Sequence, residues 1–319
     1  MTKTSFIKTR FINLTRDFGF KLCFANPEHP ELLLGLLNSL ITDREIVSIT
    51  FLNPDVMAPD EDGKRPSYDV QCTDSDGNRF IVEMQKDPYR EFGDRLLLYS
   101  GNPLQYLLKR GEPYERMRTL YVIAVLGGYL KVPDEEKPVR DALVRSAHIQ
   151  MNDTKKILTY KHNLLFLQLP AVKRITEDSP FLEKWAWYVS NIHTFEEKPE
   201  GLDGYFSLLF DCADRNNISR VALSVYDDME RDEQTIECEK RDIRIDAREE
   251  ALEEGLAKGE AKGRAEGRAE GRAEGRAEGI TAGRSEATFE MAKKMKAAGI
   301  SSDLICQCTG LSVEEVEKL

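Results

Sequence analysis

SYDVQCTDSDGNRFIVEMQ, residues 67–85, is the stretch that decides the fold. Residues 68–73 and 79–85 alternate in polarity, and the segment DSDGN between them is typical of a turn. These patterns predict two antiparallel strands joined by a five-residue loop. In that register Thr73 lies opposite Arg79, and Asp69 lies opposite Glu83.

The two opposed acidic residues are candidates for a metal site. Directly opposed residues have Cβ atoms about 5 Å apart, so the carboxylates of Asp69 and Glu83 would repel each other. A divalent cation between them would turn that cost into a binding site, because hard cations take carboxylate oxygens. The period of two also places Gln85 on the face of Glu83. The alternative is a surface hairpin with a polar outer face.

Length, charge and cysteine content indicate how many domains the chain has and which kinds of site it lacks. The chain has 319 residues, 41% of them hydrophobic, and a formal net charge of −11 at pH 7. This length predicts one large domain with appendages or two domains, and the charge argues against a general nucleic-acid coat. The 6 cysteines form no CxxC pair and the 4 histidines show no ligand spacing. We therefore expect neither a zinc site nor structural disulfides.

The sequence also bears on location. The first 20 residues have no continuous apolar core of the secretory type. The longest apolar run, around residues 120–130, is too short to cross a bilayer. We expect a cytoplasmic protein that does not span a membrane.

Residues 1–175 are expected to form an α/β core. Predicted helices cover residues 16–24, 31–41 and 91–110, and the sequence GNP at 101–103 should kink or interrupt the third. Predicted strands outside the hairpin cover residues 46–52, 119–126 and 164–169, whereas residues 53–66 form a polar loop and residues 131–160 show no clear pattern. The apolar run at 119–126 is typical of a sheet's centre, covered on both faces. The order predicts a mixed sheet flanked by helices.

Residues 176–254 are expected to form a helical extension, and residues 255–284 a linker with glycine at every fourth position. Each interior glycine costs a helix about 0.8–1 kcal/mol relative to alanine. In the GRAE part, neighbours at i,i+4 carry like charges, and only Glu254–Lys258 and Glu260–Arg264 are favourable pairs. The tract predicts a marginal helix or a flexible spacer, with self-association through the glycine stripe as a further option.

Residues 285–319 are predicted to form a small helical module. A helix ends at Gly299, Ser301 or Ser302 caps a short helix, and Ser312 caps the last one. The pattern is similar to a helix-turn-helix, but its last helix, VEEVEKL, carries three glutamates where a DNA-reading helix carries basic or amide side chains. Docking on the chain or contact with a partner fits this module better.

The chain resembles the PD-(D/E)XK nuclease superfamily and, within it, a bacterial family of recombination-promoting nucleases and transposases. The resemblance covers about residues 9–130. It rests on DFGFK at 17–21, LLN at 36–38, LN at 52–53, YDV at 68–70, DG at 76–77 and IVEMQ at 81–85, followed by Phe92, Arg95, Tyr99, Gln105, Gly111 and Tyr114. The charged glycine-repeat tail is also similar. The resemblance implies a restriction-endonuclease-like core with a helical C-terminal region.

The resemblance further implies cleavage of DNA that depends on Mg²⁺, with Mn²⁺ as an alternative. In this superfamily an acidic pair on adjacent strands holds the ion, which maps to Asp69 and Glu83. The third position, usually lysine, is Gln85 here, and an amide can orient water but cannot neutralise developing charge. Asp17 on the first helix is the candidate that completes the site.

Lys21, Lys86 and Arg95 are the candidates for contact with the DNA backbone. The alternatives are ordinary ion pairs, of Lys21 with Asp17 and of Arg95 with Glu91. Two other functions stay open: an interaction protein on a nuclease scaffold that has lost catalysis, and a transposase that joins strands as well as cutting them. Nothing in the sequence indicates a domain that reads transposon ends, which counts against the last.

Overall fold

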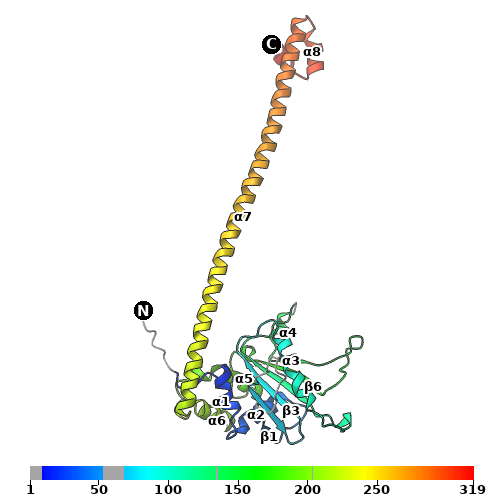
Figure 1. The fold of residues 1–319 in the computed structure, drawn as a ribbon. Coiled ribbons are helices and arrows are strands. Elements are labelled where there is room, and N and C mark those ends of the chain that lie inside the picture. The colour runs from blue at the N-terminus through cyan, green and yellow to red at the C-terminus, as the bar shows by residue number, and fades with distance from the viewer. Residues whose placement is uncertain (1–8, 53–67, 134–135, 203) are drawn as a thin grey trace, which may run out of the picture. The chain divides into compact units, whose positions relative to one another are not determined.

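The computed structural model describes residues 9–52, 68–133, 136–202 and 204–319 (Figure 1). The chain divides into two compact units, Met1–Asp232 and Glu233–Leu319, which are described separately here. The polar loop expected at 53–66 lies outside the described residues. The finer division at residues 175, 254 and 284 stays a prediction.

The first unit is built on a six-stranded mixed sheet in the order β1-β2-β3-β4-β6-β5. The strands are β1 (Ile49–Phe51), β2 (Val70–Asp74), β3 (Arg79–Gln85), β4 (Leu120–Leu126), β5 (Val144–Ala147) and β6 (His162–Gln168). The first three pair antiparallel, β3, β4 and β6 run parallel, and β5 closes the other edge antiparallel to β6. The predicted mixed α/β sheet is confirmed.

The hairpin has the predicted register. Thr73 pairs with Arg79 and Val70 with Val82, so one further step along both strands brings Asp69 opposite Glu83. Every residue of β4 is buried, as its apolar run predicts. The predicted strand at 46–52 is shorter than expected, because only β1 within it pairs as a strand.

Helices cover both faces of this sheet (Figure 1). They are α1 (Asp17–Phe24), α2 (Pro30–Leu40), α3 (Phe92–Gln105), α4 (Lys137–Arg140), α5 (Phe181–Asn191) and α6 (Gly204–Ala213), with short 3-10 turns η2 (Tyr114–Arg116), η3 (Leu169–Ala171) and η4 (Ile192–Thr194). Phe80, Val82 and Met84 of β3 belong to the core that α1, α2, α5 and α6 form on one face. Ile81 packs with Phe92 and Leu96 of α3 on the other face, as the period of two requires.

The sequence GNP at 101–103 does not interrupt the third helix, although the helix ends at Gln105 and not at the predicted residue 110. Pro103 lies inside α3, which ends two residues later. A proline has no N–H and leaves the carbonyl four residues earlier without its helical donor. That carbonyl belongs to Tyr99, and the hydroxyl of Tyr68 donates to it at 2.8 Å. The side chain from the hairpin therefore replaces the missing helical hydrogen bond.

The segment at 131–160 contains β5, an edge strand that the sequence pattern missed. Its residues are exposed or half-buried, so they carry no apolar signature. The buried side chain of Gln168 helps to attach this segment to the sheet. Its Oε1 accepts from the N–H of Leu130, and its Nε2 donates to the carbonyls of Arg140 and Ala142.

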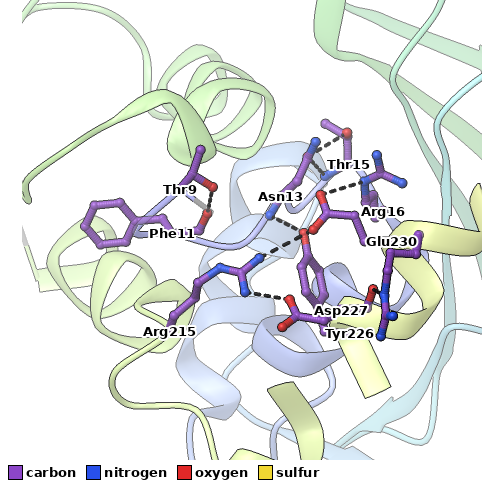
Figure 2. A network of polar contacts seen from close by, with 10 residues as sticks. Thr9, Phe11, Asn13, Thr15, Arg16, Arg215, Tyr226, Asp227 and Glu230 are labelled. Atoms are coloured by element: carbon purple, nitrogen blue, oxygen red, sulfur yellow. Dashed lines mark hydrogen bonds and ion pairs between the residues drawn. The ribbon is translucent and has the colours of Figure 1, made fainter. Parts of the chain in front are cut away.

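The helix α7 (Arg220–Ala297) begins in the first unit, where a polar network attaches it to the segment that enters α1 (Figure 2). The hydroxyl of Tyr226 accepts from the N–H of Asn13 at 2.8 Å. Arg215 pairs with Asp227 at 2.6 Å and with Glu230 at 3.4 Å, and Glu230 also lies 3.8 Å from Arg16. The network therefore holds the start of α1 against the start of α7.

In the second unit α7 continues as a helix through the glycine tract. Of the two predicted states, a marginal helix and a flexible spacer, the tract adopts the helix. The predicted ion pairs Glu254–Lys258 and Glu260–Arg264 are present, and Lys262 also pairs with Glu266 at 3.8 Å, which the prediction missed. Residues 235–287 are all exposed. These pairs therefore contribute little, as solvent-exposed pairs do.

The terminal module contains α8 (Ser302–Thr309) and α9 (Val313–Glu317). Ala292, Ile305 and Val316 form its small buried core. Ser312 caps α9 with a capping box that includes Glu315, which confirms the predicted cap. Across the described ranges of the whole chain, no helix has the length and apolarity that a membrane crossing requires.

Candidate active site

The opposed acidic residues of the hairpin are held by crossed hydrogen bonds. The backbone N–H of Asp69 donates to Oε1 of Glu83 at 3.1 Å, and the N–H of Met84 donates to Oδ2 of Asp69 at 2.7 Å. The side chains are 9% and 3% exposed, respectively. Each carboxylate is thus oriented by the strand of the other, and the hairpin register alone brings them together.

Burial works against the charges of this pair. It raises the pKa of Asp69, and the neighbouring carboxylate of Asp17 raises it further. Burial likewise raises the pKa of Glu83, and the charge of Asp69 adds to the effect. Two carboxyl groups this close and this buried favour protonation or a bound cation.

The donor chemistry of the pair fits a divalent cation. Both groups offer oxygen atoms, which Mg²⁺ and Mn²⁺ prefer, and a cation would relieve their mutual repulsion. Among the described residues no group of three or more His, Cys, Asp and Glu side chains is arranged to hold a metal ion. Asp69 and Glu83 would therefore hold the ion as a pair, with water or substrate oxygens completing its shell, which is common for Mg²⁺.

Lys21 joins the pair from α1. Its Nζ lies 2.8 Å from Oδ1 of Asp17 and 3.1 Å from Oδ1 of Asp69. Burial lowers the pKa of Lys21, but Asp17 and Asp69 outweigh it and hold that pKa above its usual value. The ion pair with Asp17 was the predicted alternative to a DNA contact, and the bond to Asp69 shows that Lys21 also belongs to the site.

Arg95 approaches the pair from α3. Its guanidinium lies 3.5 Å from Oε2 of Glu83 and 3.5 Å from Oε1 of Gln85. It also lies over the ring of Tyr99, 4.8 Å from the centroid. The alternative ion pair with Glu91 does not appear in the described part of the chain, where the ionic partner of Arg95 is Glu83.

Gln85 lies on the predicted face but its amide nitrogen turns away from the pair. Its Nε2 donates to the carbonyl of Asp87 at 3.1 Å. Lys86 follows one residue later, just past the end of β3. The pKa of His193 is lowered mainly by burial and by the charge of Arg16, and the charge of Lys86 lowers it further. The structure therefore brings Asp17, Lys21, Asp69, Glu83, Gln85 and Arg95 together.

Tyrosine side chains around Arg95 were not among the predicted site residues. The guanidinium of Arg95 lies over the ring of Tyr99. Burial is the largest single effect on the pKa of Arg95 and lowers it, but the hydrogen bond with Tyr89 and the nearby charges raise it, so the pKa lies above its usual value. The ring of Tyr68 packs against Tyr99 at 5.3 Å. The spacing of four between Arg95 and Tyr99 on one helix is the signal that could have found this arrangement.

A comparison with protein families matches residues 14–245 to a model described as PD-(D/E)XK nuclease family transposase. The matched range includes every residue of the site and the whole sheet. Comparisons with curated proteins and with solved structures gave no match.

Proposed function

Because the chain belongs to the PD-(D/E)XK nuclease family of transposases, we propose that it is a Mg²⁺-dependent DNA endonuclease that hydrolyses phosphodiester bonds. In this proposal Asp69 and Glu83 hold the ion, for which Mn²⁺ is an alternative. Gln85 positions the attacking water, and Arg95 contacts the DNA backbone. The cytoplasmic location and the role in recombination or transposition that the sequence predicts belong to the same proposal.

The buried carboxylate pair is the observation that carries the proposal. Glu83 is 3% exposed and lies beside a second carboxylate, an arrangement that costs folding free energy unless a cation or a proton compensates it. The crossed backbone hydrogen bonds keep both groups in place although they repel each other. Such a retained cost is typical of a functional site.

Hydrolysis would proceed by attack of water on the phosphorus. The water oxygen forms a new bond to phosphorus and loses a proton to the solvent. The bond from phosphorus to one ester oxygen breaks, its electron pair stays on that oxygen, and the oxygen takes up a proton. A bound divalent ion would supply a more acidic water and neutralise phosphate charge. The chain supplies the orientation, because Asp69 and Glu83 are aligned by the N–H groups of Met84 and Asp69.

Plasmid cleavage with Mg²⁺ tests the proposal. We expect wild-type protein to convert supercoiled plasmid to nicked or linear DNA, and Asp69→Ala or Glu83→Ala to lose about 100-fold or more of the rate. Glu45→Ala, at an exposed position between α2 and β1, is the matched control and should cleave like wild type. Equal cleavage by all four proteins, or no divalent-dependent cleavage by wild type, would contradict the proposal.

The same assay separates the two alternatives. A wild-type protein that binds DNA or a partner protein but cleaves nothing in Mg²⁺ or Mn²⁺ would be an interaction protein on this scaffold. Products in which a cut end has been joined to a second DNA molecule would identify a strand-joining transposase, in keeping with the family of transposases to which the chain belongs. Hydrolysis products alone support the plain endonuclease.

A further inference from the structure

The candidate site has no positive side chain at position 85 of β3, where the neutral Gln85 stands next to the carboxylate pair. Hydrolysis of a phosphodiester places additional negative charge on the phosphate oxygens in the transition state. Gln85 carries no charge, and its Nε2 is bound to the carbonyl of Asp87. A positive group that reaches the phosphate must therefore come from another element.

Lys21 on α1 meets the geometric requirements. Its ammonium lies 3.1 Å from Oδ1 of Asp69, the oxygen that faces away from the hydrogen bond with Met84. An ammonium has three N–H donors, and two of them account for Asp17 and Asp69. The side chain is 30% exposed, and the third donor remains for a substrate oxygen.

We infer that Lys21 is a catalytic cation of this site, which binds a non-bridging oxygen of the scissile phosphate, and that Asp17 is the residue that positions it. The inference rests on the proposed nuclease function. A divalent ion held by Asp69 would compete with the ammonium of Lys21 for Oδ1. The contact with Asp17, on the same helix, would then hold the ammonium in place. Asp17 is 53% exposed and lies one turn before Lys21, which suits a positioning role.

The backbone of α1 is held firmly enough for such a role. A Cβ at Gly19 would lie 2.3 Å from the carbonyl oxygen of Asn13 and 3.3 Å from the ring of Tyr226. Close contact at this glycine presses α1 onto the preceding segment, and the hydroxyl of Tyr226 binds the N–H of Asn13 (Figure 2). Phe20, next to Lys21, packs in the same core as Val82 and Met84 of β3, so the Cα of Lys21 has a defined position relative to the hairpin.

Arg95 is the other cation at the site and suits the role less well. Its closest contacts to Glu83 and Gln85 are 3.5 Å, longer than those of Lys21. Its guanidinium is also stacked on Tyr99. It is placed to hold Glu83 and the DNA backbone, whereas Lys21 directly contacts Asp69, the other carboxylate that would hold the ion.

Lys21→Met tests the inference when three quantities are measured: the single-turnover cleavage rate with Mg²⁺, the DNA affinity in Ca²⁺ by fluorescence anisotropy, and the Mg²⁺ affinity by calorimetry. We expect the rate to fall about 100-fold, as for loss of one electrostatic donor in other active sites. DNA affinity should stay close to wild type. Mg²⁺ affinity should rise, because a competing positive charge is removed.

Lys198→Met is the matched control. Lys198 is 31% exposed and pairs with Asp211, which is 53% exposed, so its environment matches that of Lys21 and Asp17. We expect no change in any of the three quantities. Lys21→Arg keeps the charge and should retain part of the rate. If Lys21→Met does not fold, Lys21→Gln, which can still bond to both carboxylates, should show the same loss of rate.

The outcomes separate this inference from the proposed function. A wild-type protein that cleaves while Lys21→Met cleaves equally well overturns the role of Lys21 alone. A fall in Mg²⁺ affinity, or a fall in DNA affinity that accounts for the whole loss of rate, also overturns it, because Lys21 would then be structural or a binding contact. A wild-type protein that does not cleave with any divalent ion overturns the nuclease proposal itself.

Discussion

Glu83 accepts a hydrogen bond from the backbone N–H of Asp69 at 3.1 Å, although the two side chains repel each other. The reciprocal bond runs from the N–H of Met84 to Asp69. The hairpin therefore holds two buried carboxylates in one place at the expense of its own stability. That relationship sets the first two predictions.

Glu83→Gln should separate stability from activity. The amide oxygen can still accept from the N–H of Asp69, but one buried negative charge is removed. At pH 8 and without divalent ions we expect the free energy of unfolding to rise by about 1.4 kcal/mol, the equivalent of one pKa unit. Cleavage should fall about 100-fold or more. Denaturant unfolding and plasmid cleavage measure the two effects, and a less stable variant that still cleaves would contradict the prediction.

The stability of the metal-free protein should fall as pH rises. A carboxyl group whose pKa is higher in the folded state binds more protons when folded, so its contribution is complete at low pH and is lost through the folded pKa. The window runs from about 4, the ordinary value, to about 7 for Asp69 and about 8 for Glu83. Unfolding curves across this range, with the Asp69→Asn/Glu83→Gln double variant as control, measure it.

Mg²⁺ should oppose this loss at the upper end of the window. A ligand that binds only the folded state adds stability, and the deprotonated pair is the form that binds it. The difference between unfolding with and without Mg²⁺ should therefore grow with pH. An equal pH dependence in wild type and double variant would show that the carboxylate pair does not titrate as described.

Gly19→Ala should destabilise the first unit because its Cβ would lie 2.3 Å from the backbone oxygen of Asn13. A backbone clash of this kind forces α1 to shift, and we expect a loss of about 1–3 kcal/mol. Gly93→Ala in α3 is the control, since nothing lies within 4 Å of its Cβ. It should be neutral or stabilise the helix by up to about 1 kcal/mol. Equal effects at both positions in denaturant unfolding would refute the close approach at Gly19.

Tyr68→Phe should leave the carbonyl of Tyr99 without a donor and cost about 1–2 kcal/mol. Pro103→Ala restores an N–H four residues after Tyr99, so the same Tyr68→Phe change should cost less in that background. A double-mutant cycle in denaturant measures the difference. If Tyr68→Phe costs the same with proline and with alanine at position 103, the hydroxyl does not replace the helical bond.

Alanine at four glycines of the tract, Gly263, Gly267, Gly271 and Gly275, tests whether the glycines serve contacts or only weaken α7. Nothing lies within 4 Å of a Cβ at these positions, and each change should favour the helix by about 0.8–1 kcal/mol. We expect higher helix content by circular dichroism and an unchanged mass by light scattering. A drop in mass on substitution would instead reveal self-association through the glycine stripe.

The hairpin and its register follow from the local sequence alone. A five-residue turn and a period of two leave one pairing, which opposes Asp69 to Glu83 and puts Gln85 on the same face. The same holds for the buried centre of the sheet at β4 and the cap at Ser312. These features depend on neighbouring residues, so local spacing is enough to predict them.

The charges that meet the carboxylate pair depend on the packing of separate elements. Lys21 reaches Asp69 from a helix 48 residues earlier in the chain. Pro103 stays inside α3 because Tyr68, in the segment before β2, supplies a hydrogen bond. Each of these outcomes depends on how separate elements pack against one another, and the periodicity of a single segment carries no information about that packing.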